Sequence, residues 1–333
     1  MADCWGSVTL GRQGLHKLVT TVRNTIIISL IVLLFACGQS TGAQTVVFLS
    51  TDSLTSTART ISGARSVIRG QYEDAILHKV LIWADETSHA SGIDSIRSLK
   101  PDILVTVGSA ATQIARDNFD KIPIIFSAVK YPVISGFVAS VDRPGSRITG
   151  ASLDIPVNIQ FRYFRQIIPN LKQIGVLYTS NTAKLIAPAR VIASEMGLEL
   201  IPIKIDSRRD LPSALDSLAK CTQGLWSVAD PNLFDPQSTK YILLNSLRHG
   251  LPFMGFSRYV VESGALFALD FDYKAIGRQA GRIATEVLAG ADPGRIRVTA
   301  PDIIWFHYNE KTAKHVRIDI PDELMAIAKE IYR

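Results

Sequence analysis

Short apolar runs alternate with longer segments of helical period along most of the chain. In the first half, the runs that predict strands lie at residues 45–50, 77–83, 103–107 and 122–126. Helical periodicity between them predicts helices over residues 58–68 and 93–99. The runs at 103–107 and 122–126 are almost continuously apolar. Such runs are typical of strands in a parallel sheet that helices cover on both faces.

The second half repeats this alternation. Strands are predicted at residues 173–178, 198–205, 224–228 and 251–256, and helices at 183–196, 211–220 and 238–248. Strand–helix alternation of this length indicates βαβ units, and therefore an α/β fold with parallel sheets. About ten strands are too many for one open sheet, so we expect two doubly wound lobes. The boundary is predicted near residues 148–156, after a turn at 142–145.

The first residues differ in character from the rest. Arg12, Lys17 and Arg23 precede an apolar run at 26–36 that only Ser29 interrupts, and small or polar residues follow. This layout predicts an export signal over residues 1–36 and a linker over 37–44. The apolar run has about 11 residues, whereas a permanent membrane span needs roughly 20. The alternative is a short anchor that stays attached.

Two processing outcomes are open for an exported chain. Residues 34–37 resemble a bacterial lipobox, in which Cys37 is lipidated and becomes the new N-terminus. Cleavage after Ala43 by an ordinary signal peptidase is the alternative. We favour lipidation, because a cysteine directly after the apolar run is otherwise hard to explain. Either outcome places the protein in the periplasm or on the outer side of a bacterial inner membrane.

Composition removes several classes of protein. Apolar residues make up 47% and charged residues 20% of the chain, which excludes a disordered or coiled-coil protein. The net charge of +6 falls to +4 (33 − 29) once residues 1–36 are removed, and the basic residues are scattered. This pattern does not indicate a nucleic-acid partner. Cys221 is the one cysteine after Cys37, so an internal disulfide is excluded, and we predict it to be a small buried residue.

Ligands in parallel α/β sheets bind beyond the carboxyl ends of the strands. Gly108, Ser109 and Ala110 follow the strand at 103–107, and a helix starts at once. Its first N–H groups and partial positive charge suit a carboxylate or a phosphate. The alternative is that Ser109 caps its own helix.

Other strand ends supply further candidates. Ser127 follows the strand at 122–126, with Lys130 and Tyr131 lining or rimming the cleft, and Asp230 is placed to accept a hydrogen bond from an ammonium group. The alternative for Asp230 is an Asx turn beside Pro231. Trp226, Phe256 and Tyr259 either stack on an aromatic ligand or belong to the core. The full set of predicted ligand-binding residues is Ser50, Gly108, Ser109, Ala110, Ser127, Val129, Thr179, Asp230, Asn232, Phe256 and Asp270.

Sequence signatures of catalysis are missing. The six histidines include no metal-spaced pair, and the chain has no Gly-x-Ser-x-Gly elbow, Walker loop or dinucleotide-binding Gly-x-Gly-x-x-Gly after its first strand. A cysteine-type two-base mechanism needs two thiols, and Cys221 stands alone after Cys37. We therefore expect a protein that holds a ligand without altering it, is not an enzyme, and uses neither metal nor cofactor.

Six stretches carry a family resemblance, and they are residues 101–111, 122–129, 143–150, 174–178, 261–266 and 272–281. Through them the chain resembles the extracytoplasmic substrate-binding proteins of ABC transporters, in the group that includes tryptophan- and tyrosine-binding members. The resemblance implies a type I periplasmic-binding-protein (Venus flytrap) fold, with two lobes joined by a three-strand hinge. It also implies that Ser109 and Ala110 offer N–H groups to a ligand carboxylate, that Ser127 and Val129 line the first lobe, and that Asp230 lines the second.

The resemblance and the pattern together predict the domains. The N-terminal lobe is expected to hold residues 45–153 plus 272–292, the C-terminal lobe 154–271 plus 293–320, and a C-terminal helix 321–333. Residues 272–289 would be a helix returning to the first lobe, between crossing strands at 266–271 and 302–307. The chain departs from the family at Lys130-Tyr131-Pro132, where the family has Thr-Asp-Pro, and at Asp230-Pro231, where aromatic-amino-acid binders have Asp-Asn. The identity of the ligand is left open.

The expected function is that of a receptor for an ABC importer. The ligand would be a small carboxylate-bearing, amino-acid-like molecule bound between the lobes, and the partner a permease in the inner membrane. We expect a monomer. The alternative is a ligand-sensing input protein for a membrane signalling kinase or cyclase, since the same fold and export signal serve both roles.

Overall fold

The computed structural model describes residues 43–83 and 86–333. The expected export signal, Cys37 and residues 37–42 of the expected linker lie outside this range. Within the described residues, the structure contains no helix that combines the length and the apolar character needed to cross a membrane.

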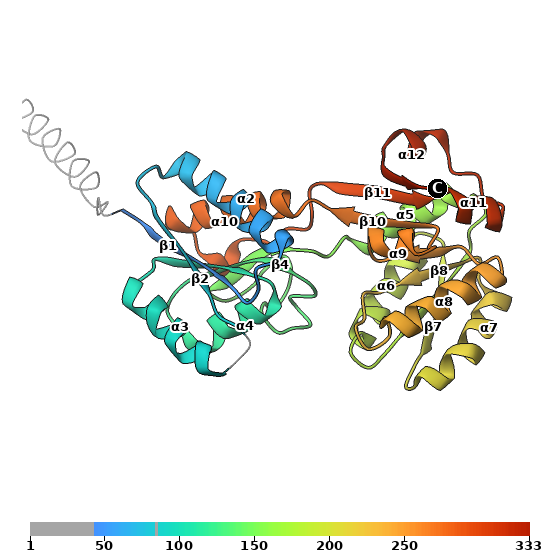
Figure 1. Cartoon of the computed structure of the whole chain (residues 1–333), viewed down its shortest axis with the longest axis horizontal. Helices are drawn as coiled ribbons and strands as arrows, with labels where there is room; N and C mark the ends of the chain where they lie inside the picture. The colour runs from blue at the N-terminus through green and yellow to red at the C-terminus, as the bar shows by residue number, and fades with distance from the viewer. Residues whose placement is uncertain (1–42, 84–85) are drawn as a thin grey trace, which may run out of the picture. The chain divides into compact units, whose positions relative to one another are not determined.

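The first sheet is wholly parallel, with the strand order β2-β1-β3-β4-β5. Its strands are β1 (Thr45–Ser50), β2 (Ile76–Leu81), β3 (Ile103–Val107), β4 (Ile124–Val129) and β5 (Ile148–Ser152). Helices α2 (Thr55–Gln71) and α10 (Tyr273–Leu288) pack side by side on one face, and α3 (Glu86–Leu99) and α4 (Ser109–Asn118) pack on the other (Figure 1). Residues of β3 are buried throughout, as expected of a strand with helices on both sides.

The second sheet has the order β12-β11-β10-β9-β8-β6-β7. Its strands are β6 (Gln173–Tyr178), β7 (Glu199–Lys204), β8 (Gly224–Ser227), β9 (Phe253–Gly255), β10 (Phe267–Phe271), β11 (Ile304–Asn309) and β12 (Ala328–Tyr332). The pair β10–β11 is antiparallel and the other pairs are parallel. Helices α5 (Val157–Ile167) and α6 (Ala183–Glu195) pack on one face, and α7 (Leu211–Cys221), α8 (Pro236–Arg248) and α9 (Arg258–Glu262) on the other. The remaining short helices are α11 (Glu310–Val316) and α12 (Asp322–Ala326).

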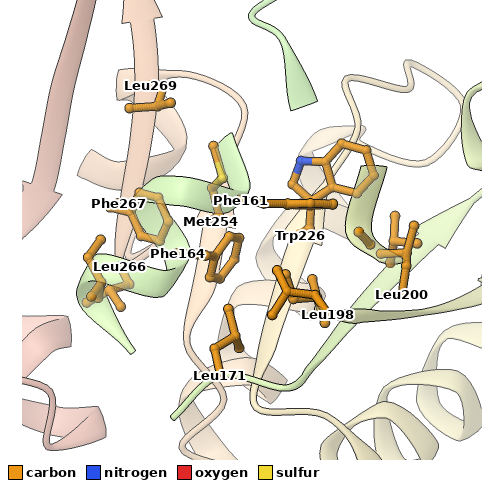
Figure 2. Packing of buried hydrophobic residues seen from close by; sticks show 14 of the residues in the cluster. Phe161, Phe164, Leu171, Leu198, Leu200, Trp226, Met254, Leu266, Phe267 and Leu269 are labelled. Carbon is orange, nitrogen blue, oxygen red and sulfur yellow. The ribbon is translucent and has the colours of Figure 1, made fainter. Parts of the chain in front are cut away.

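Aromatic side chains pack among leucines in the core between α5 and the second sheet (Figure 2). Phe161 meets Trp226 edge to face with ring centroids 5.2 Å apart, and Phe164 meets Phe267 in the same way at 4.9 Å. Such pairs add about 0.5–1.5 kcal/mol each beyond the burial of apolar area. This packing holds β8 and its Trp226 in place in the second lobe.

The chain passes three times between the two sheets. It leaves β5 for α5, leaves β10 for α10, and leaves α10 for β11. The expected returning helix and the two crossing strands are therefore present as α10, β10 and β11. The α/β class with two lobes built on parallel sheets is confirmed. Strand β5 and helices α5, α9 and α11 are additions that the sequence pattern did not predict.

Three predictions are wrong. Residues 293–320 are expected in the C-terminal lobe, but Thr299 pairs with Ala151 of β5 and the Val298 N–H donates to the Val141 carbonyl oxygen, so the start of this stretch packs on the first sheet. Residues 321–333 do not form one helix, because the chain ends α12 at Ala326 and adds β12 to the edge of β11. The helical periodicity there is overridden by the hydrogen-bonding edge that β11 offers. Cys221 is exposed rather than buried, because it ends α7 beyond the last buried position, Leu218.

Candidate functional site

Two buried hydroxyl groups lie at the carboxyl edge of the first sheet. Ser50 pairs in register with Val107, and Val107 pairs with Ser127. Residues paired in this way point to the same face of a sheet. The side chains of Ser50 and Ser127 are fully buried, and neither hydroxyl finds a hydrogen-bond partner among the described residues. Orphaned buried hydroxyls are uncommon, so each of these needs an explanation.

The start of α4 lies at the same edge of the sheet but on the opposite face from these hydroxyls, because Val107 packs with α2 and α10 whereas Thr106 contacts Thr112 of α4. Gly108 is its N-cap residue with φ of 86°, a left-handed conformation that glycine adopts without strain. No side chain caps α4, so the alternative in which Ser109 caps its own helix is wrong. Ser109 and Ala110 are exposed, and the first N–H groups of a helix have no partner within it. The Gly108 N–H donates to the Ser127 carbonyl oxygen at 2.9 Å, which holds the start of α4 against β4.

A bulge interrupts β4 next to Ser127. The register with β5 shifts between Ser127 and Val129, and Ala128 has φ of 58°. Bulges are common near functional sites, because they redirect the chain. The side chain of Val129 is fully buried in the core on the α4 side, and its carbonyl oxygen accepts from the Leu153 N–H at 2.8 Å.

In the second lobe, Asp230 is almost completely buried and bonded to its own loops. Its Oδ2 accepts from the hydroxyls of Thr179 at 2.7 Å and Thr182 at 2.6 Å, and from the Thr179 N–H at 3.3 Å. Its Oδ1 accepts from the N–H of the exposed Asn232 at 3.0 Å, which is the Asx-turn geometry. Asp230 therefore ties together the loops that follow β6 and β8.

A cavity of about 230 Å³ lies where the segments that follow β4 and β5 meet β8, β9 and β10. Most of its lining side chains are apolar, including Trp226, Phe256, Leu269 and Phe271. Lys130, Tyr131 and Asp154 add polar groups. The structure thus gathers residues that lie far apart in the sequence around one pocket.

The predicted ligand-binding residues lie partly in the cavity and partly at the edge of the first sheet. Phe256 lines the cavity, whereas Ser50, Ser127 and Ser109 lie at the edge of the first sheet. Asp270 is half-buried, and its carboxylate accepts from the N–H groups of Phe271 at 2.9 Å and Arg258 at 3.4 Å.

The three aromatic candidates also differ. Trp226 belongs to the core and lines the cavity as well, so its stacking on an aromatic ligand stays a prediction. Phe256 is partly exposed and contacts the core on the other face of the sheet. Tyr259 is 62% exposed and lies below the Arg258 guanidinium.

Lys130, Tyr131 and Asp154 form a compact polar group at one side of the cavity. The Tyr131 N–H donates to both carboxylate oxygens of Asp154, at 2.8 and 3.1 Å, and Tyr131 has φ of 52°. Burial raises the pKa of Asp154 to about 6. Hydrogen bonds from Ser152 and Tyr131 and the charge of Lys130 oppose this rise. Burial lowers the pKa of Lys130, against the charges of Asp154 and Asp270, and raises the pKa of Tyr131.

Sequence reasoning placed Lys130 and Tyr131 at the cleft but missed Asp154. That residue stands in the segment identified only as the lobe boundary. An acidic residue two positions before Pro156, at a predicted crossing between lobes, was the available signal.

The chain was compared with known proteins. The family model described as ABC transporter substrate binding protein matches residues 45–332. The chain belongs to this family. Its description is that of proteins that bind substrates.

A curated relative of this substrate-binding protein is the tyrosine-binding protein of Clostridioides difficile (strain R20291). The two are 28% identical over 220 residues, which is 65% of this chain and 63% of that protein. The chain thus matches less than two thirds of the length of its relative.

Solved structures show the same fold at low identity. A ligand-free, open substrate-binding protein with adhesive properties from Clostridium difficile aligns with a TM-score of 0.72 and 20% identity, over 87% of this chain and 99% of that one. A domain from Streptococcus pneumonia in complex with L-Trp aligns with a TM-score of 0.62 and 20% identity, over 87% of this chain and 100% of that one.

Proposed function

We propose that this substrate-binding protein is the extracytoplasmic solute receptor of an ABC importer and binds a small carboxylate-bearing ligand between its two lobes. Family membership supports the receptor role, and the predicted export signal supports a location outside the cytoplasm. The partner would be an inner-membrane permease. The relative named for tyrosine binding and the structure that holds L-Trp support an amino-acid-like ligand.

The observation that carries this proposal is the uncapped start of α4 at the sheet edge where the hydroxyls of Ser50 and Ser127 also lie. A ligand carboxylate at this place accepts hydrogen bonds from the N–H groups of Ser109 and Ala110. The partial positive charge of the helix start stabilises it. The two orphaned hydroxyls then gain the acceptor that the described chain does not provide.

The second lobe contributes through the loops that Asp230 holds. Because both carboxylate oxygens of Asp230 accept from its own loops, we assign it a positioning role. It keeps the ends of β6 and β8 in place to face the ligand. A ligand that touches both lobes favours the closed arrangement by the contacts it gains there.

A proline at position 109 tests the carboxylate subsite. Ser109 is the first residue of α4, where a helix tolerates proline, and Gly108 before it has ψ of 164°, which proline also allows. Ser109→Pro removes the Ser109 N–H and hydroxyl, and Ser109→Ala removes the hydroxyl alone. We expect Ser109→Pro to weaken binding about tenfold or more, since a hydrogen bond to a charged group contributes about 1.5–3 kcal/mol. Ser109→Ala should stay close to wild type.

Calorimetry with L-tyrosine and L-tryptophan, and with tyramine and tryptamine as carboxyl-free controls, provides the measurement. Equal affinity for an amino acid and its amine, or equal affinity in the proline and alanine variants, would contradict the carboxylate subsite. Uptake of the bound solute by cells with and without the gene tests the importer role separately. Unchanged uptake on deletion would contradict it.

A further inference from the structure

Most polar side chains around the cavity beside Lys130 already have hydrogen-bond partners within the protein. Gln160 accepts from the Trp226 indole N–H at 2.7 Å and donates to the Ile155 carbonyl oxygen at 2.7 Å. The Ser227 hydroxyl donates to the Met254 carbonyl oxygen at 2.7 Å. These groups therefore need no ligand.

Lys130 is the exception among these polar side chains. Across the described residues, its amine makes no hydrogen bond or ion pair in the structure, although it lines the cavity and is only partly exposed. The carboxylates of Asp154 and Asp270 lie near enough to favour its charged form. Their oxygens, however, accept from the N–H groups of Tyr131, Phe271 and Arg258.

The Lys130 amine is partly withdrawn from water but keeps some contact with it. The surrounding burial lowers the pKa of Lys130. An apolar side chain of similar length would fill the same space without an amine to keep in contact with water. A lysine whose amine is free to donate beside a mostly apolar cavity therefore fits a role toward a ligand.

The cavity and the proposed carboxylate subsite border the same hydrophobic cluster. Leu153 and Phe271 line the cavity, and both pack in the same hydrophobic cluster as Val107, the residue directly before Gly108. One ligand with its carboxylate at α4 can place its body against the cavity walls.

We infer that Lys130 is a specificity-determining residue that donates a hydrogen bond to an acceptor on the apolar body of the ligand. The substrate class is then a small acid with an apolar body whose far end carries a hydroxyl, carbonyl or carboxylate group. This inference rests on the proposed function, because it takes the first carboxylate of the ligand to lie at α4.

Matched pairs of probes test the inference. Each pair differs only in the far-end acceptor: L-tyrosine and L-phenylalanine, 4-hydroxyphenylpropanoate and phenylpropanoate, adipate and hexanoate. In calorimetry, wild type should bind the acceptor-bearing member of at least one pair tenfold or more tightly, because a site built to hydrogen-bond a ligand rejects the analogue that lacks the group. Lys130→Met should remove that preference by weakening the acceptor-bearing member alone. Lys184→Met, at an exposed lysine on α6, is the matched control and should keep the preference.

The stability of the ligand-free protein gives a second readout. Lys130→Met should melt at or above the wild-type temperature, since it removes an unpaired, partly buried amine. A lower melting temperature for Lys130→Met than for wild type would contradict the argument that the Lys130 amine does not help the ligand-free protein to fold. A preference that survives in Lys130→Met, or the absence of any preference or binding in wild type, would overturn the inference.

Failure of this inference can be told from failure of the proposed function. If the carboxylate subsite is correct, Ser109→Pro weakens both members of a pair to the same extent and leaves their ratio unchanged. If Lys130→Met removes the preference while Ser109→Pro changes nothing, the role of Lys130 stands and the subsite at α4 is wrong.

Discussion

Asp154 holds the backbone of Tyr131 in an unusual conformation. Tyr131 has φ of 52°, a region that non-glycine residues seldom occupy, and its N–H donates to both oxygens of the Asp154 carboxylate. Local strain of this kind persists where surrounding contacts compensate for it. The same carboxylate lies in a largely apolar pocket, and burial there raises its pKa to about 6.

This raised pKa predicts a pH dependence of stability. An unfolded aspartate has a pKa of about 3.9, so between about pH 4 and pH 6 the folded protein binds more protons at Asp154 than the unfolded chain does. The contribution of Asp154 to the free energy of unfolding is therefore largest below about pH 4 and is lost as the pH rises through about 6.

Asp154→Asn has no group to titrate, which isolates this contribution. Urea unfolding of both proteins from pH 4 to pH 7 should show wild type losing stability relative to Asp154→Asn as the pH rises. A difference between the two proteins that stays constant over this range would contradict the raised pKa.

At the scale of elements, the packing of α2 against α10 depends on glycine. A Cβ at Gly277 would collide with the carbonyl oxygen of Thr60, and one at Gly281 would lie 2.8 Å from the carbonyl oxygen of Ala64. The backbones of the two helices therefore approach more closely than larger residues allow. This contact holds the returning helix on the first sheet, next to the strand ends of the proposed carboxylate subsite.

Gly277→Ala should destabilise the protein by about 1–3 kcal/mol, because carbonyl backbone is in the way and one of the helices must move. Gly70→Ala on α2 is the matched control, since a Cβ there meets open space. Its effect should stay within about 1 kcal/mol, on the stabilising side, because alanine favours the helix. Chemical denaturation of the two variants measures both effects. Equal stabilities would show that the helices separate without cost.

At the scale of the whole molecule, the first sheet is completed by a helix from late in the chain. Residues of α10, among them Ile276, Ala280 and Ile283, form one core with residues of β1, β3 and α2. Residues 44–153 therefore lack part of the cover over their own sheet. Neither lobe is a continuous stretch of sequence.

A fragment of residues 44–153 should fail to fold cooperatively, because it exposes the apolar face that α10 covers. Residues 44–153 joined by a flexible linker to residues 272–292 should recover a cooperative transition. Thermal unfolding followed by circular dichroism compares the two fragments. Cooperative unfolding of the shorter fragment would contradict the predicted composition of the N-terminal lobe.

Much of the fold is predicted by the local pattern of apolar and polar residues. The apolar run at β3 and the alternation of strands and helices predicted most elements and the two-lobed α/β class, because buried strands and amphipathic helices leave a short-range signature. The same signature misassigned residues 321–333, where helical periodicity met the open edge of β11. It also missed β5, a strand with polar and glycine residues that the bulged β4 and the crossing segments cover.

The candidate site, too, was predicted only in part from the sequence. Sequence placed Ser109, Ser127 and Asp230 at strand ends, and it placed Lys130 and Tyr131 near a cleft. Which strands neighbour one another, and in what register, decides the alignment of Ser50 with Ser127 and the bonding of the Asp230 carboxylate. It also decides that the Lys130 amine has no partner within the described part of the chain.

The amino-acid sequence by itself determined the kinds of elements, their order, and the strand ends where a ligand could be held, since each follows from interactions between near neighbours in the chain. The tertiary structure alone decided which of those side chains are already bonded and which are not. That distinction is set by contacts between distant segments, because a buried polar group is satisfied or orphaned according to what the fold brings against it.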